Sequence, residues 1–242
     1  MGQAANIVLP IRGGEVVRVG VVLSGVESFG PVVISVLLEK YLDLILFVLS
    51  SLAVSANLPE ETSQRFSSIL FPLCIIATLA VIIILFKGDS IWKFLRRWIK
   101  FDSPFLQNVL LRVDKVVNSL VYLRRPDFLI RQLGISVVIW VIMLVTNLFL
   151  LKALNLPFDF RIGGLVLTLV YAGILPALMP GNVGPFYYFA RIALEQFNLD
   201  AQASLAFAIL LHAMVSIPPL FLSALFLIFD KNIFARLKPH LK

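Results

Sequence analysis

The sequence predicts an all-α, polytopic integral membrane protein that forms a single transmembrane domain over residues 1–242. Hydrophobic residues make up 60% of the chain and charged residues only 14%, which leaves too little polar surface for a soluble domain. Four apolar stretches have the roughly 20 residues needed to cross about 30 Å of hydrocarbon. Clusters of glycine and proline interrupt two further apolar regions, which predicts two re-entrant hairpins of broken helices.

The first 31 residues hold several glycines, and this region predicts a turn followed by a short helix rather than a span. The four expected spans cover residues 32–54, 67–86, 133–151 and 203–229. Two shorter apolar arms, 163–179 and 186–197, flank a stretch of helix breakers. The domain is divided into the second part of repeat one (1–54), a span with cytoplasmic amphipathic helices (55–131) and repeat two (132–242).

Basic residues indicate which side of the membrane each loop faces. Residues 87–131 carry ten Lys or Arg and the tail after residue 230 carries four, whereas 57–66 holds only Arg65 against two glutamates. The positive-inside rule places the basic loop and the C-terminus in the cytoplasm. These charges border apolar spans and contact anionic head groups there, so nucleic acid is not an expected partner. Counting spans from the cytoplasm makes the two short arms enter and leave on the outer side.

The cytoplasmic section predicts two amphipathic helices. Between residues 91 and 101, four basic side chains share one helical face opposite aliphatic and aromatic ones, so this segment is expected to lie in the membrane interface. Residues 105–121 repeat apolar side chains at helical spacing and predict the second helix. Membrane bracing is favoured over substrate binding as the role of both.

The stretch from residue 175 to residue 191 predicts a site in broken backbone. Five helix breakers fall within ten residues and exclude a continuous helix: Pro176, Pro180, Gly181, Gly184 and Pro185. Such backbone at membrane depth needs cover from protein or from a water-filled cavity. We expect a non-helical tip over residues 180–184, and a site with the polar residues Asn182, Tyr187, Tyr188 and Arg191. The alternative is a polar loop that reaches the surface between two short helices.

The start of the chain echoes this stretch and predicts an inverted repeat. Pro10 precedes Gly14 by four residues, as Pro180 precedes Gly184, and an arginine follows each pair. The interval from Arg18 to Glu39 equals that from Arg191 to His212, and each enters a long span. Because the two segments approach from opposite sides, broken helices from both halves are expected to meet near the midplane. The second half has a further span and arm before its proline, so the echo also predicts that an N-terminal span and arm are missing.

Ionisable residues near the first span are the strongest indication of a site, since each costs about 2.5 to 3.5 kcal/mol at a helix centre. Glu39 and Asp43 share one helical face, and Lys40 lies between them in sequence. Arg12, Glu15 and Arg18 precede them. One interpretation is a polar cavity in which Arg12 and Arg18 bind a phosphate; the other is a cluster of ion pairs that fixes the hairpin. His212 is either a packing residue or a ligand-binding one.

Several kinds of chemistry are disfavoured by what the sequence lacks. No His, Cys and Asp constellation has the spacing of a metal site, and no phosphate loop or nucleophile elbow is present. The single cysteine, Cys74, lies in an apolar stretch, where a thiol behaves as a small apolar side chain. We expect no enzyme activity, no cofactor and no metal.

Three blocks resemble the transmembrane flippase-like family of lysylphosphatidylglycerol synthetases: NIVLPIRGGEVVRVG, LLEKYLDL and MPGNVGPFYYFARIAL, the last ahead of a span with LLH. Pro10, Arg12, Gly14, Glu15 and Arg18 match the first pattern, Glu39 and Asp43 the second with Lys40 in place of Arg, and Pro180, Gly181 and Gly184 the third. The chain departs from the pattern at Tyr187, where the family commonly has Glu, and at His212, where it commonly has Arg. The resemblance implies a lipid translocase in a plasma membrane.

The leading hypothesis is therefore a flippase-like transporter that moves an anionic phospholipid or a polyprenyl-linked lipid between leaflets. Its substrate would contact Arg12, Glu15, Arg18, Glu39, Lys40, Asp43, Asn182, Gly184, Tyr187, Arg191 and His212. The alternative is a membrane module of a lipid-modifying enzyme that presents lipid to a partner aminoacyl- or glycosyltransferase. The expected partners are membrane lipids and, in addition, either a second copy of the chain or a partner transferase.

Overall fold

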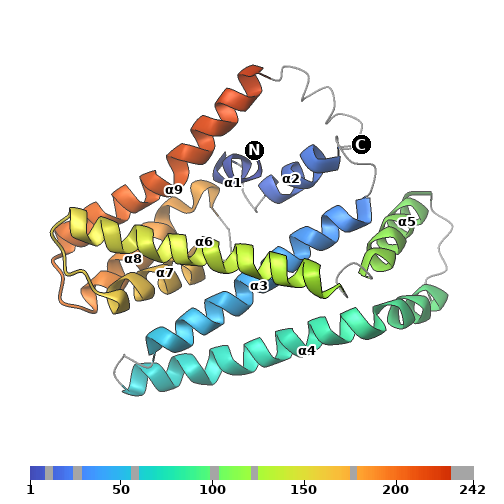
Figure 1. Ribbon diagram of the computed structural model, residues 1–242, viewed down its shortest axis with the longest axis horizontal. Coiled ribbons are helices and arrows are strands. Elements are labelled where there is room, and N and C mark those ends of the chain that lie inside the picture. The colour runs from blue at the N-terminus through green and yellow to red at the C-terminus, as the bar shows by residue number, and fades with distance from the viewer. Residues whose placement is uncertain are drawn as a thin grey trace.

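The computed structural model describes residues 1–8, 13–23, 29–55, 60–98, 104–120, 125–174 and 179–229, and it is helical throughout these parts apart from short turns and loops (Figure 1). In chain order the elements are α1 (Gly2–Val8), α2 (Gly13–Leu23), α3 (Phe29–Ser55), α4 (Glu60–Trp98), α5 (Pro104–Ser119), α6 (Pro126–Ala153), α7 (Phe160–Ile174), the 3₁₀ turn η2 (Pro180–Asn182), α8 (Val183–Glu195) and α9 (Ala201–Phe229). The all-α prediction is confirmed for the described residues.

Two described helices, α6 and α9, are long and apolar enough to cross a membrane. They correspond to the expected spans 133–151 and 203–229. Their outer faces carry exposed aliphatic side chains, such as Val138 at 57% and Ile217 at 60% exposure, as expected for helices that contact hydrocarbon. Helix α3 coincides with the expected span 32–54, but three charged residues lie in its middle. That α3 and α4 also cross the membrane stays a prediction.

The largest hydrophobic core joins α6, α7, α8 and α9. Leu151, Leu194 and Phe207 are fully buried in it. Helices α7 and α8 pack side by side, and their closest approach is at Gly173, where the ring of Phe189 occupies the space that a Cβ would fill. A glycine is required there because any side chain would push the two helices apart.

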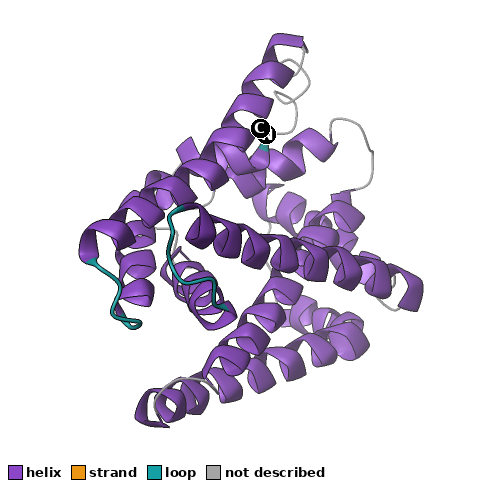
Figure 2. Ribbon diagram, turned by 60° about the vertical axis from the view of Figure 1, so that its left-hand side comes forward, coloured by secondary structure: helices purple, strands orange, loops and turns teal. Residues whose placement is uncertain are grey.

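Two aspartates begin the helices at one end of this core. Asp159 accepts a hydrogen bond from the amide of Arg161 at 2.8 Å and so caps α7, and Asp200 accepts from the amides of Gln202 and Ala203 at the start of α9. The described loops that carry these caps, α6–α7 and α8–α9, lie at the same end of the bundle, on the left in Figure 1 and in teal in Figure 2. The α7–α8 hairpin therefore points its tip toward the opposite end.

The N-terminal region contains one more helix than the sequence predicted. Helix α1 precedes the expected short helix, α2, and packs against it through Gly2 and Gly14, whose lack of side chains permits close contact. The elements α1, α2 and α3 thus repeat the order of α7, α8 and α9: two short helices and a long one. Helix α1 also contacts η2 and α9, so the two helical hairpins touch each other. Their opposite orientation in a membrane stays a prediction.

Helix α4 corrects the expectation of a separate interfacial helix over 91–101. It runs without interruption through 39 residues, about 58 Å at 1.5 Å per residue, from the expected span 67–86 to Trp98. Gly88 does not end the helix, and its lack of a side chain leaves room for Leu120, which would lie 2.7 Å from a Cβ at this position. Near the C-terminal end, Trp92 donates a hydrogen bond to Asp114 at 2.6 Å, which ties α4 to α5. Helix α5 is the second amphipathic helix expected over 105–121, and it packs on α3.

Candidate functional site

Five charged side chains from α2 and α3 form one network, here named the charged cluster: Glu15, Arg18, Glu39, Lys40 and Asp43. The Arg18 guanidinium donates to both oxygens of Glu39, with Nη1–Oε1 at 2.8 Å and Nη2–Oε2 at 2.7 Å. Lys40 Nζ lies 3.3 Å from Glu15 and 3.9 Å from both Glu39 and Asp43. A bidentate pair of this kind sets the orientation of the two side chains as well as the distance between them. It therefore holds α2 against α3.

The pairing bears on the two interpretations of this region. Arg18 is engaged with a carboxylate, as the ion-pair interpretation expects, and its side chain is still 48% exposed. Lys40 bridges the three carboxylates rather than pointing away from them. Arg12 lies outside the described residues, and a role of Arg12 or Arg18 in phosphate binding stays a prediction.

Two aromatic side chains connect the charged cluster to the C-terminal core. The Trp140 indole on α6 donates to Asp43 at 3.4 Å, and its ring packs against that of Tyr171 on α7 with centroids 5.1 Å apart. Tyr171 also contacts Phe47, one turn beyond Asp43 on α3. The sequence analysis did not identify Trp140 or Tyr171. An indole N–H in the middle of an apolar span was the available signal, since it requires an acceptor when buried.

A second polar group, here named the His212 bridge, links α9 to the tip of the α7–α8 hairpin. His212 Nε2 lies 2.9 Å from the main-chain oxygen of Gly181, and Nδ1 lies 2.8 Å from the Tyr187 hydroxyl. Because a carbonyl only accepts, Nε2 carries a proton. In the neutral imidazole Nδ1 then accepts from the tyrosine O–H. The Phe186 ring stacks on the imidazole at 4.7 Å.

The tip depends on two left-handed residues. Gly181 has φ 62° and Asn182 has φ 53°, so the chain turns sharply between the extended Met179 and the start of α8. A Cβ at position 181 would also lie 3.4 Å from the main-chain oxygen of Ile7 in α1. The non-helical part ends at Asn182, so the expected tip over 180–184 is too long: Val183 and Gly184 begin α8, and Pro185 fits its first turn, where the ring removes no helical hydrogen bond.

Three predicted site residues lie away from the His212 bridge. Arg191 pairs with Glu195 on its own helix at 2.6 Å, and both side chains are partly exposed. The equal spacing of Arg18 to Glu39 and Arg191 to His212 therefore does not give equal contacts. Tyr188 is 61% exposed, and Gly184 is exposed on the first turn of α8.

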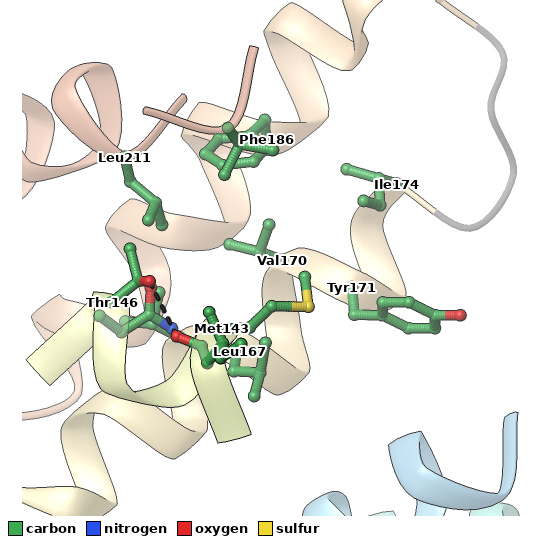
Figure 3. A pocket seen from close by; sticks show the side chains of 12 residues that line it. Met143, Thr146, Leu167, Val170, Tyr171, Ile174, Phe186 and Leu211 are labelled. Carbon is green, nitrogen blue, oxygen red and sulfur yellow. Dashed lines mark hydrogen bonds between the residues drawn. The ribbon is translucent and has the colours of Figure 1, made fainter. Parts of the chain in front are cut away.

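An apolar cleft of about 570 Å³, including its open mouth, lies beside the His212 bridge. Phe186 forms part of its wall, so one ring lines the cleft and covers the imidazole. Figure 3 shows Phe186 and Leu211 on one side of the space, with Met143 and Leu167 facing them from α6 and α7. Among the described residues, no group of three or more His, Cys, Asp or Glu side chains has the arrangement of a metal site.

A family model described as the lysylphosphatidylglycerol synthase TM region matches residues 1–223. The chain belongs to this family. No curated protein and no solved structure matches it. The match confirms the resemblance seen in the sequence blocks. As a member of the lysylphosphatidylglycerol synthase TM family, the chain is a membrane protein with a lipid-related function.

The structure adds a relation between the two departures from the family pattern. Tyr187 and His212, the two positions where the sequence blocks depart from the family pattern, are hydrogen-bonded to each other. The contact here is between two side chains that are neutral in their common forms, whereas the N-terminal hairpin is held by a charged pair.

Proposed function

We propose that the protein is a flippase-like transporter that moves an anionic phospholipid or a polyprenyl-linked lipid between the leaflets of a plasma membrane. The family places the chain among membrane proteins of lipid-related function, and the charged cluster supports transport. The cluster lies midway along α3, a helix that is otherwise almost entirely apolar. Ionisable groups at such a position are costly and are a feature of substrate paths.

The contact between the two helical hairpins gives a second line of support. Helix α1 packs on η2, so broken backbone from one half lies against a hairpin of the other. Transporters built from inverted repeats bind substrates where such elements meet. In the proposed arrangement the α7–α8 hairpin is re-entrant from the outer side, and the basic loop 87–131 and the C-terminus are cytoplasmic.

A substrate head group would exchange contacts with the charged cluster. The Arg18 guanidinium binds Glu39 in the described state, and a phosphate offers the same planar pair of acceptors. A lipid phosphate that competes for Arg18 would release Glu39 toward Lys40, whose ammonium is already 3.9 Å away. The substrate would thus open the connection between α2 and α3 through its own charge.

A leaflet-resolved assay tests this function. Vesicles with the purified protein and fluorescent phosphatidylglycerol are exposed to a membrane-impermeant quencher, and lipid arrival in the outer leaflet gives the rate. Wild type should accelerate exchange, and Glu39→Gln should slow it about tenfold, since a lost charged hydrogen bond is worth about 1.5 to 3 kcal/mol. Arg161→Gln, in the exposed pair with Asp159, is the matched control and should retain the rate.

The outcomes separate the proposal from its rival. A wild-type protein that moves no anionic lipid would refute transport. Binding of lipid without movement would favour a membrane module that presents lipid to a partner transferase. Equal rates for wild type and Glu39→Gln would show that the charged cluster does not carry the function.

A further inference from the structure

The cleft beside the His212 bridge has a lining from four helices, and its composition restricts what can occupy it. Val170 and Leu167 from α7, Phe186 from α8 and Leu211 from α9 are all buried. Its empty space of about 570 Å³ includes the open mouth, so the enclosed part is smaller than this figure and suits one slender group rather than a whole lipid. The walls are almost entirely hydrocarbon and aromatic, so a polar ligand would lose its hydration without gaining partners.

The donor groups of two polar side chains in the lining are used inside the protein. Asn147 Nδ2 donates to the main-chain oxygen of Gly163 at 3.2 Å. The Thr146 hydroxyl donates to the oxygen of Ile142 at 2.8 Å, one turn back on α6. The Asn147 bond ties α6 to α7 and the Thr146 bond lies within α6, so neither of these donors is directed at an occupant.

The mouth of the cleft opens between α6 and α9, the two described helices that are long and apolar enough to cross a membrane. Of the lining residues, Ile142 on α6 and Val215 on α9 have exposed side chains, at 58% and 46%. The residues beside them on the outer faces are also exposed and apolar, including Val141 at 52% and Met214 at 51%. In a membrane these faces contact acyl chains. An opening between the two faces is therefore accessible to an acyl chain.

We infer that this cleft is a subsite for one hydrocarbon chain of a membrane lipid, which enters laterally between α6 and α9. The inference rests on the proposed function and names where the apolar part of the substrate binds. Tyr171 lines the cleft and packs on Trp140, and Trp140 donates to Asp43 of the charged cluster. The end of the cleft at Tyr171 is therefore joined to the charged cluster by two side-chain contacts.

One side chain, Phe186, connects the cleft to the tip of the α7–α8 hairpin. Phe186 lines the cleft and stacks on His212, whose nitrogens hold Gly181 and Tyr187. A chain packed against Phe186 fixes its ring, and with it the imidazole that holds the tip. Occupancy of the cleft should then order residues 179–187, so the subsite connects binding of the lipid tail to the broken backbone.

Photolabelling with a lipid probe tests the subsite independently of transport. Vesicles of phosphatidylethanolamine and phosphatidylglycerol contain the full chain and a phosphatidylglycerol with a diazirine midway along one acyl chain, and labelled peptides are mapped by mass spectrometry. Wild type should be labelled at cleft residues of α7 and α8, such as Val170 and Phe186. Ile142→Trp, which fills the mouth from an exposed position, should reduce this labelling about tenfold, because the indole occupies the opening; tenfold corresponds to about 1.4 kcal/mol.

Ile135→Trp is the matched control. Ile135 lies two turns earlier on the same face of α6, is 50% exposed and does not line the cleft, so labelling of α7 and α8 should be unchanged. Hydrogen exchange of residues 179–187 should slow when the lipid is present in wild type but not in Ile142→Trp.

Labelling confined to the outer faces of α6 and α9, or equal labelling of α7 and α8 in Ile142→Trp and wild type, would overturn the subsite. Its failure is distinguishable from that of the proposed function. Lipid transport with an unlabelled cleft refutes the subsite alone. A labelled cleft in a protein that moves no lipid refutes transport alone.

Discussion

Replacing His212 with phenylalanine is expected to loosen the tip of the α7–α8 hairpin while the ring packing is retained. The imidazole makes two hydrogen bonds, at 2.9 Å to Gly181 and 2.8 Å to Tyr187, and both partners lose them in His212→Phe. The stack on Phe186 survives, because a benzyl ring occupies nearly the same space. The cost is therefore that of one main-chain carbonyl and one hydroxyl left without these partners in a partly buried place, about 2 to 4 kcal/mol together.

A double-mutant cycle divides this cost between the two bonds. Tyr187→Phe removes only the bond to Nδ1 and should cost about 1 kcal/mol. The double variant should be more stable than the sum of the two single costs predicts, by about 1 kcal/mol, because the shared bond is lost only once. Tyr188→Phe is the matched control: it is the next residue, it is exposed, and it should change stability by no more than about 0.5 kcal/mol.

The measurement is the free energy of unfolding in mixed detergent micelles, followed by circular dichroism for wild type and the four variants. Equal stability of wild type and His212→Phe would refute the role of the imidazole. Additive single costs would show that His212 and Tyr187 act independently, in contradiction to their contact.

Three further predictions concern other parts of the chain. Exchanging the charges in an Arg18→Glu, Glu39→Arg variant should restore most of the expression that either single change loses, since the pair is rebuilt; no recovery of expression would refute the Arg18–Glu39 pair as the contact that stabilises this region. Gly181→Ala should lower the melting temperature and cost about 1 to 2 kcal/mol, because φ is positive and the main chain of α1 lies close by; a neutral effect would refute the strain. Asp159 has a lowered pKa because the Arg161 side chain and amide donate to it, so its stabilisation is complete above the ordinary value of 3.8 and is lost as the pH falls through the lowered pKa. The melting difference between wild type and Asp159→Ala should shrink in that acid range, and a difference that grows on acidification would contradict the assignment.

The helical class and the approximate positions of most helices follow from local properties of the sequence. Long runs of apolar residues define α6 and α9, and the breakers around Gly181 define the turn between α7 and α8. The continuity of α4, which joins the expected span 67–86 to the expected interfacial helix 91–101, was not predictable in this way. A change from apolar to amphipathic pattern indicates a change of surroundings, but the backbone bends only where a breaker or a lost hydrogen bond permits it. Gly88 alone did not provide that.

The residues of the site were predicted more completely than their contacts. Charges near Glu39 indicated a polar group, and the bidentate pair with Arg18 was one of two interpretations. The Trp140 contact joins residues 97 positions apart, and the His212 bridge joins residues 25 and 31 positions apart. Such pairs depend on how helices pack, which periodicity does not specify.

The residues that pair with the charged side chains of α3 are synthesised at different times during translation. The cations that neutralise Glu39, and Glu15 that meets Lys40, all belong to the first 40 residues, so these partners are all synthesised before α4. Trp140, which completes the network at Asp43, is synthesised roughly 5 to 20 s later at typical translation rates. The cations that meet the carboxylates of α3 are thus already synthesised when α3 enters the bilayer, whereas the contact with Trp140 can form only after α6 has been made.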